Sequence, residues 1–199
     1  MKKTVLSLTL LLAFTVNLMA QTPRQVLDKA AKIVTSDSGV KADFKLTNSV
    51  GSTSGTIAIK GAKFHATTPQ AIVWYDGKTQ WTYVKNNDEV NVTTPTAAQQ
   101  QAINPYTFIH LYRQGYKMTM NKTASAFTVH LTAQEASRKI QELFITVDKK
   151  SYHPTQVKML QGKKWTTFDI SGIKKQQIAD ATFRFNQKDF PSAEVIDLR

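Results

Sequence analysis

Cysteine is absent from all 199 residues of this chain. A bacterial lipoprotein carries its acyl chains on a cysteine that follows the apolar part of its signal peptide, so an anchor of that kind is excluded. Disulfide bonds are excluded as well. An exported domain with this sequence must therefore be stabilised by its hydrophobic core alone.

A long hydrophobic run is also missing. The longest apolar segment, Val5–Val16, is shorter than the ~20 residues that a membrane-spanning helix needs, and polar residues soon follow it. Lys2 and Lys3 precede this segment, and Ala20 provides a small residue for cleavage. These features predict a signal peptide over residues 1–20, cleaved after Ala20, and a soluble periplasmic product. The remaining residues, 21–199, fit a single domain.

Catalytic motifs are lacking too. The sequence contains no Gly-x-Ser-x-Gly, no His-Glu-x-x-His and no glycine-rich phosphate loop. No histidine has a second histidine or a carboxylate at a metal-binding spacing; the four are His65, His110, His130 and His153. We therefore predict no catalytic, metal or cofactor site and a protein that is not an enzyme. An active site assembled from distant strands stays open as the alternative.

The formal net charge of +12 has two interpretations. It favours attraction to an anionic membrane or an acidic partner, or it serves solubility alone. The lysines are scattered along the chain rather than gathered with interleaved aromatic residues, so nucleic acid is not expected as a partner.

The segment after residue 20 carries a helix signal. Thr22 can cap the helix, Pro23 suits the first helical position, and Gln25 completes a capping box. Apolar residues recur at helical spacing as far as Val34, and Asp37-Ser38-Gly39 predicts the end. The apolar side of this helix is expected to lie against a sheet.

Most of the remaining chain alternates apolar and polar residues with a period of two, which indicates half-buried strands. These stretches recur at hairpin spacing from Val40 to Leu198, separated by polar turns such as Asn48–Ser54, and predict roughly ten or eleven strands. Phe183 and Phe185 are expected in one of the last strands. The pattern predicts a mainly β fold built as one curved antiparallel sheet or barrel.

The strongest local signal lies in Ala71–Thr94, which predicts three short strands joined by two tight turns. Asp76-Gly77 separates two apolar and aromatic runs, a pattern typical of a type I′ hairpin turn with φ > 0 at both central residues. One face of this meander is expected to be strongly apolar. That face covers either a protein core or a cavity for an apolar ligand.

Alternation places every second side chain of a strand on the same face, and we predict that this face lines a cavity. The candidate cavity residues are Phe44, Ile57, Ile59, Phe64, Trp81, Tyr83, Phe127 and Leu143. A register error of one residue would reverse the face. Ordinary core packing under the N-terminal helix is the alternative for each position.

A second short helix is predicted over residues 104–112, where Asn104 can cap and Gly115 follows the end. The candidate lid residues are Pro105, Phe108, Ile109 and Tyr112. The last three share one helical face. We expect this face to cover the mouth of the empty cavity and to move aside for a ligand. The alternative is a helix that is fixed in the core.

Several motifs, taken in order, resemble the LolA family of periplasmic carriers of outer-membrane lipoproteins. The family pattern Asp-Gly-Lys-x-x-Trp-x-Tyr, followed by a valine-alternating strand, matches residues 76–83 and 90–92. Weaker matches along nearly the whole predicted domain are Ala42-Asp43-Phe44, Gly55 with Ile57, Ile59 and Phe64, Asn104–Phe108, Thr167-Phe168, Ile178–Ala181, Phe183–Phe185 and Val195–Asp197.

The resemblance implies a half-open antiparallel β-barrel of about eleven strands, with an N-terminal helix and short lid helices over an apolar cavity. It also implies a carrier that receives acylated lipoproteins from an inner-membrane lipoprotein-releasing ABC transporter. The carrier would deliver them to the outer membrane or to an acceptor protein there. We expect a monomer without a cofactor. The alternative is a LolA-like binder or sensor of another lipid or glycolipid of the cell envelope.

The sequence departs from the family pattern at two places. Relatives often carry an Arg-Pro pair in the hairpin before a conserved aromatic residue, where the arginine ties the lid shut. Here the corresponding run is Lys60-Gly61-Ala62-Lys63-Phe64, and Lys45 stands where a glutamine is usual. Because position 61 is not an arginine, we expect the lid to be less firmly latched.

Overall fold

The computed structural model describes residues 21–96 and 111–199, and these form a mainly β fold, as predicted. The helical elements are α1 (Pro23–Val34), η1 (Asp180–Phe183) and η2 (Gln187–Asp189). The strands are β1 (Val40–Asn48), β2 (Gly51–Lys60), β3 (Lys63–Thr67), β4 (Ala71–Tyr75), β5 (Gln80–Val84), β6 (Glu89–Thr93), β7 (Tyr116–Lys122), β8 (Ala126–Ala133), β9 (Ile140–Asp148), β10 (Pro154–Gln161), β11 (Lys164–Lys175) and β12 (Glu194–Asp197).

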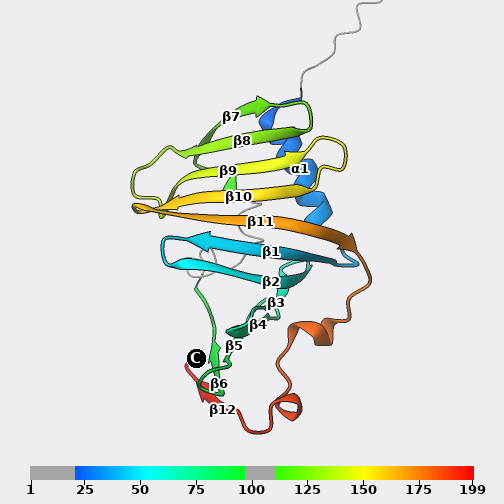
Figure 1. The fold of residues 1–199 in the computed structure, drawn as a ribbon, viewed down its shortest axis with the longest axis vertical. Coiled ribbons are helices and arrows are strands. Elements are labelled where there is room, and N and C mark those ends of the chain that lie inside the picture. Colours follow the sequence, from blue (N-terminus) through cyan, green and yellow to red (C-terminus); the bar gives the residue numbers. More distant parts are fainter. Residues whose placement is uncertain (1–20, 97–110) are drawn as a thin grey trace, which may run out of the picture.

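All twelve strands of the described chain belong to one sheet, in the order β12-β6-β5-β4-β3-β2-β1-β11-β10-β9-β8-β7. Two meanders, β1–β6 and β7–β11, are joined where β1 pairs with β11. Neighbouring strands are antiparallel, except that β12 runs parallel to β6. Within the described residues β7 and β12 form the two edges, so the twisted sheet is not closed (Figure 1). This confirms the prediction of a half-open antiparallel architecture.

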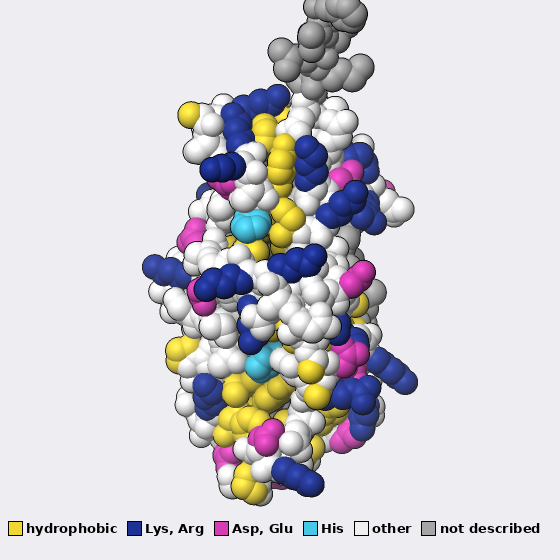
Figure 2. Space-filling model, turned by 90° about the vertical axis from the view of Figure 1, so that its right-hand side faces the viewer, with side chains coloured by type: hydrophobic (Ala, Val, Ile, Leu, Met, Phe, Trp, Pro, Cys, Tyr) yellow, Lys and Arg dark blue, Asp and Glu magenta, His cyan; other side chains and the backbone are white. Residues whose placement is uncertain are grey.

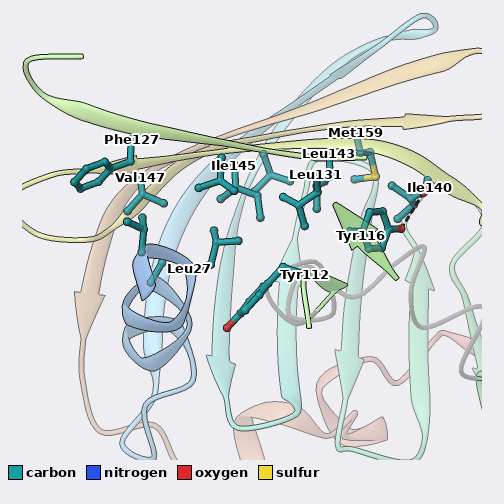
Figure 3. Packing of buried hydrophobic residues seen from close by; sticks show 14 residues of the cluster. Leu27, Tyr112, Tyr116, Phe127, Leu131, Ile140, Leu143, Ile145, Val147 and Met159 are labelled. Atoms are coloured by element: carbon teal, nitrogen blue, oxygen red, sulfur yellow. Dashed lines mark hydrogen bonds between the residues drawn. The ribbon is translucent and has the colours of Figure 1, made fainter. Parts of the chain in front are cut away.

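The N-terminal helix begins where its capping signal predicts. Thr22 Oγ1 accepts a hydrogen bond from the Gln25 N–H at 3.2 Å, and Gln25 Oε1 accepts one from the Thr22 N–H at 3.0 Å. α1 lies against β7, β8 and β9, and we call the sheet face that it covers the inner face (Figure 1). Leu27 and neighbouring helix residues pack there against side chains of β8, β9 and β10 (Figure 3).

Two turn predictions are wrong. Asn48–Ser54 is not a long turn, because β1 and β2 remain paired as far as Asn48 and Gly51. The polar side chains of this segment do not prevent strand pairing, because the hydrogen bonds between the two strands are made by backbone groups. At the β4–β5 turn only Gly77 has a positive φ, of 102°, so the turn is not type I′. Asp76 instead accepts hydrogen bonds from the N–H groups of Lys78 and Thr79, at 3.0 and 2.9 Å.

The predicted strand at Phe183 and Phe185 is also wrong. Phe183 ends the 3₁₀ helix η1, and Phe185 follows it outside any strand. This part of the chain covers the outer face of the β1–β6 meander, where Phe183 packs with Ala58. Lys60 and Lys63 hold it there through ion pairs to Asp180, at 2.9 and 2.7 Å. The aromatic residues are thus buried by covering the sheet and not by extending it.

Candidate lipid-binding pocket

An apolar pocket of about 310 Å³ lies on the inner face, beside the C-terminal end of α1. Its walls come from β1, β2, β3 and β4 on one side and from β10 and β11 on the other, with one residue from the helix. The described residues that line it are Val34, Val40, Ala42, Phe44, Leu46, Thr53, Ile57, Ile59, Phe64, Ala66, Thr68, Val73, Pro154, Val157, Phe168, Ile170 and Ile173.

Hydrocarbon dominates this lining. Among the described residues of the pocket, only Thr53 and Thr68 have polar side chains. Thr53 Oγ1 donates to Gln70 Oε1 at 3.0 Å, and Thr68 Oγ1 donates to the Ala71 carbonyl oxygen at 3.1 Å. Because both hydroxyl protons are already engaged, the pocket offers an incoming molecule mainly apolar contact. It is therefore suited to a hydrocarbon chain.

Phe44 contributes an aromatic ring to the pocket, and Gly55 makes room for it. The two residues are paired across β1 and β2. A Cβ atom at Gly55 would lie 2.9 Å from Phe44 Cζ and would collide with the Thr67 carbonyl oxygen. A glycine at this strand position therefore allows the close approach of the ring.

A β-bulge in β11 shapes the opposite wall. Asp43 faces Ser171 and Lys41 faces Lys174, so β11 has one residue more than β1 between these pairs. Gly172 lies inside the bulge with a φ of 61°, a conformation that favours glycine. The extra residue shifts the alternation of side chains. As a result, Ile173 lines the same pocket as Ile170, although the two are three positions apart and would lie on opposite faces of a regular strand.

The structure places the eight candidate cavity residues in three environments. Four of them line the pocket, namely Phe44, Ile57, Ile59 and Phe64. Trp81 and Tyr83 lie on the outer face, because their strand neighbours Gln80 and Thr82 take the inner positions opposite Tyr75 and Val73. Both pack there with Val90, Val92 and Phe190.

Phe127 and Leu143 belong to the core under α1, where they are 7% and 0% exposed. Of the candidate lid residues, Pro105, Phe108 and Ile109 lie outside the described residues. Tyr112 is described; it lies in the same core and does not line the pocket.

Tyr112 is tied to the helix. Its side chain is 1% exposed, extends toward α1 with the hydroxyl at the helix end (Figure 3), and donates a hydrogen bond from that hydroxyl to Asp28 Oδ1 at 2.5 Å. Burial, and then this bond to a carboxylate, raise the pKa of Tyr112 above its usual value. The described end of the predicted lid segment is thus anchored in the core, while movement of the remainder stays a prediction.

Sequence reasoning missed several lining residues, and the signal was present for some of them. Ala42 and Leu46 alternate with polar residues in the same strand as Phe44. Phe168 and Ile170 alternate in the same way in β11, which pairs with that strand. Val34 and Ile173 had no such signal, because one depends on where the helix ends and the other on the bulge.

His65 lies between the lining residues Phe64 and Ala66 on β3 but does not itself line the pocket. His65 lies on the outer face, stacked on Trp74 with ring centroids 5.5 Å apart. Burial, and then the nearby Lys41 ammonium, lower the pKa of His65. Within residues 21–96 and 111–199, no three side chains of the metal-binding types are grouped so that they could hold an ion. None of the helices in this described part of the chain is long and apolar enough to cross a membrane.

Residues 13–163, about three quarters of the chain, match the model described as outer membrane lipoprotein carrier protein LolA. The chain belongs to the LolA family. Members of this family are binding and carrier proteins. No curated protein matches the sequence.

Solved structures share the fold of this LolA-family chain at low sequence identity. An uncharacterised conserved protein from Thermus thermophilus aligns over 89% of this chain and 99% of its own, with 11% identity and a TM-score of 0.60. A LolA superfamily protein from Nitrosomonas europaea aligns over 83% of this chain and 99% of its own, with 11% identity and a TM-score of 0.45. The likeness to the Thermus protein concerns the fold alone.

Proposed function

We propose that this protein is a periplasmic, non-enzymatic carrier that binds the acyl chains of lipoproteins in the inner-face pocket and moves them to the outer membrane. The observation that carries the proposal is the pocket, with a hydrocarbon lining whose two threonine hydroxyls are already hydrogen-bonded. Membership of a lipoprotein-carrier family supports it. In this proposal residues 1–20 are an export signal cleaved after Ala20, and residues 21–199 act as a single monomeric domain.

The proposed partners follow from the cargo. An inner-membrane lipoprotein-releasing ABC transporter would lift the acylated protein out of one bilayer, and the outer membrane or an acceptor there would receive it. Burying a hydrocarbon chain is worth ~0.8 kcal/mol per CH₂, so a ~14-carbon chain is held by on the order of 11 kcal/mol. Such a chain does not cross water at a useful rate. An apolar pocket resembles the bilayer interior, so the free energy of the acyl chain changes little when it passes from the bilayer to the carrier.

The size of the pocket refines the proposal. A volume of about 310 Å³ lies at the lower end of the range of ~300–1,000 Å³ typical of ligand pockets. This favours one acyl chain in the pocket, with any further chains of the cargo accommodated elsewhere.

The test is mass spectrometry of molecules that co-purify with the protein after export. We expect lipoproteins or their acylated fragments to be bound by the natural protein. Ala66→Phe, which places a ring in the pocket, should reduce bound material at least tenfold. Thr67→Phe puts the same ring on the other face of β3 and is the matched control.

Two outcomes would change the conclusion. Recovery of another lipid or glycolipid in place of lipoproteins would support the alternative carrier or sensor. Equal recovery from both variants, or no lipid in the natural protein, would overturn the assignment of this pocket.

A further inference from the structure

The turns of two neighbouring hairpins lie side by side at one end of the sheet. Asn48 of β1 is paired with Gly51 of β2 and with Thr166 of β11. The β1–β2 turn therefore lies next to the β10–β11 turn (Figure 1). We call residues 49–50 and 162–164 the paired hairpin tips.

The first tip exposes a large apolar side chain. Val50 is 89% exposed, more than Val195 and Leu198, the other exposed large hydrophobic residues of the described chain. Asn48 Oδ1 accepts hydrogen bonds from the N–H groups of Val50 and Gly51, at 2.8 and 3.2 Å. The exposure of Val50 is thus a property of a formed turn, and it cannot be attributed to a frayed end.

The second tip carries unpaired positive charge. Lys163 and Lys164 are exposed, and neither takes part in the ion pairs found among the described residues. Residues 46–54 and 160–168, which contain both tips, include no carboxylate. Lysine and arginine side chains are also spread over other parts of the surface, as one face of the molecule shows (Figure 2). Some of these charges are already neutralised; Lys60 and Lys63, for example, are paired with Asp180.

An amphipathic aromatic residue adjoins the same tip. Trp165 follows Lys164 and is only partly buried, and Lys158 Nζ lies 4.5 Å from the centroid of its indole ring. Tryptophan is enriched where a bilayer meets water, and lysines near an anionic bilayer are attracted to its surface. An exposed valine, a tryptophan and two free lysines together match the chemistry of an anionic lipid surface.

We propose that the paired hairpin tips are the surface through which this protein contacts an anionic lipid bilayer. The pocket supports this orientation. Leu46, Thr53 and Phe168, which line one end of the pocket, lie on the same strands a short distance from the tips. Docking through the tips would bring that end of the pocket toward the bilayer. The carboxylates at this end belong to other turns and strands. Asp88 and Glu89 lie at the β5–β6 turn, Glu194 begins β12 beside Glu89, and Glu135 lies in the β8–β9 turn. Glu142 of β9 is paired with Leu160 near the second tip, but its carboxylate is bonded to His130 at 2.9 Å.

The first experiment measures co-sedimentation of the exported protein with vesicles of phosphatidylethanolamine and phosphatidylglycerol. Phosphatidylcholine vesicles serve as the uncharged comparison. We expect binding to the anionic vesicles only. Removing both tip charges, Lys163→Gln with Lys164→Gln, should weaken partitioning about 30-fold, because each lysine near the surface contributes about fivefold. Val50→Ser should weaken it roughly five- to tenfold.

The matched control lies on the same strand. Lys174→Gln with Lys175→Gln removes the same charge at the opposite end of β11 and should change partitioning less than about threefold. Equal losses from the two pairs would mean that net charge alone drives binding and would overturn the proposal. Failure of the natural protein to bind anionic vesicles would overturn it too.

The second experiment locates the contact directly. Because the chain has no cysteine, Val50→Cys provides a single labelling site for an environment-sensitive fluorophore. Its emission should shift to shorter wavelength on anionic vesicles, while a label at Lys174→Cys should not respond. Equal responses would refute the assigned surface.

Binding of a neutral lipophilic dye, measured on the same proteins, separates this inference from the proposed function. A variant that no longer binds the dye has a damaged pocket. A variant that binds the dye but no longer binds vesicles has lost only the contact made by the paired hairpin tips.

Discussion

The two halves of the inner face differ in what covers them. Over β7–β10, α1 and Tyr112 fill the space above the sheet, and Leu131 and Leu143 are completely buried. Over β1–β4 the same alternation of apolar residues continues, but Phe44 and Val73 are only partly buried and line an open pocket. One continuous sheet therefore carries a closed core under α1 and, beside it, an apolar pocket.

The length of the helix explains this difference. α1 has 12 residues and is therefore about 18 Å long. Twelve strands with a spacing of ~4.8 Å extend over more than about 50 Å. The helix can thus cover only part of the inner face. Among the described residues, the apolar strand pattern extends farther than α1, and the apolar pocket lies where it does so.

The largest expected effect tests the contrast directly. Leu143→Ala leaves a cavity in the closed core and should lower the free energy of unfolding by about 3 kcal/mol. Ile170→Ala, in the pocket wall, should cost about 1 kcal/mol, because its side chain already faces open space and loses fewer contacts. Urea denaturation of the exported protein measures both. Equal costs would show that the pocket half is packed as tightly as the helix-covered half.

A smaller effect concerns how the closed half is secured. Tyr112→Phe removes a hydrogen bond to the Asp28 carboxylate and should cost about 1.5 kcal/mol. Tyr116→Phe removes a bond at 2.9 Å to the neutral Ile140 carbonyl oxygen and should cost about 1 kcal/mol. The same denaturation experiment compares them. If Tyr112→Phe has no effect, the contact with α1 does not anchor residue 112.

Much of the fold was predictable because the signals are local. The capping box of Thr22 and Gln25 lies within one helical turn, and period-two alternation locates most of the strands. The same alternation identified Phe44, Ile57, Ile59 and Phe64 as one surface, which lines the pocket in the structure. That lipid binds there stays a prediction.

The remainder depends on contacts between distant segments. Trp81 and Tyr83 are large and apolar, so local reasoning places them inside the curve of the sheet. They lie outside because Phe185 and Phe190, far later in the chain, cover the outer face of their strand. Both faces of this meander are therefore partly buried, and alternation alone cannot distinguish them. Only the packing of the C-terminal segment determines which face of the meander carries Trp81 and Tyr83.

The smallest expected effect uses acidity to probe the outer covering of the pocket half. His65 lies on β3 against Trp74, and burial, followed by the charge of Lys41, lowers its pKa in the folded protein. In the unfolded chain His65 therefore takes up a proton near pH ~6.5, the usual pKa of histidine, whereas in the folded protein it does so only at a lower pH. The contribution of His65 to the free energy of unfolding is therefore fully present above the unfolded pKa and is lost as the pH falls toward the lowered pKa of the folded protein.

His65→Phe should remove this part of the pH dependence between about pH 7.5 and 5.5, because phenylalanine can occupy a similar place beside the indole but has no ionisable group. Unfolding in urea at the two pH values measures the difference for each protein. We expect the natural protein to lose more stability on acidification than the variant. Hydrogen exchange should show that the additional loss is concentrated in β3 and β4, with the strands under α1 less affected. An identical pH response in both proteins would mean that His65 is free to take up a proton in the folded state. The outer face of the pocket half would then be more open to water than the packing of Trp74, Phe185 and Phe190 indicates.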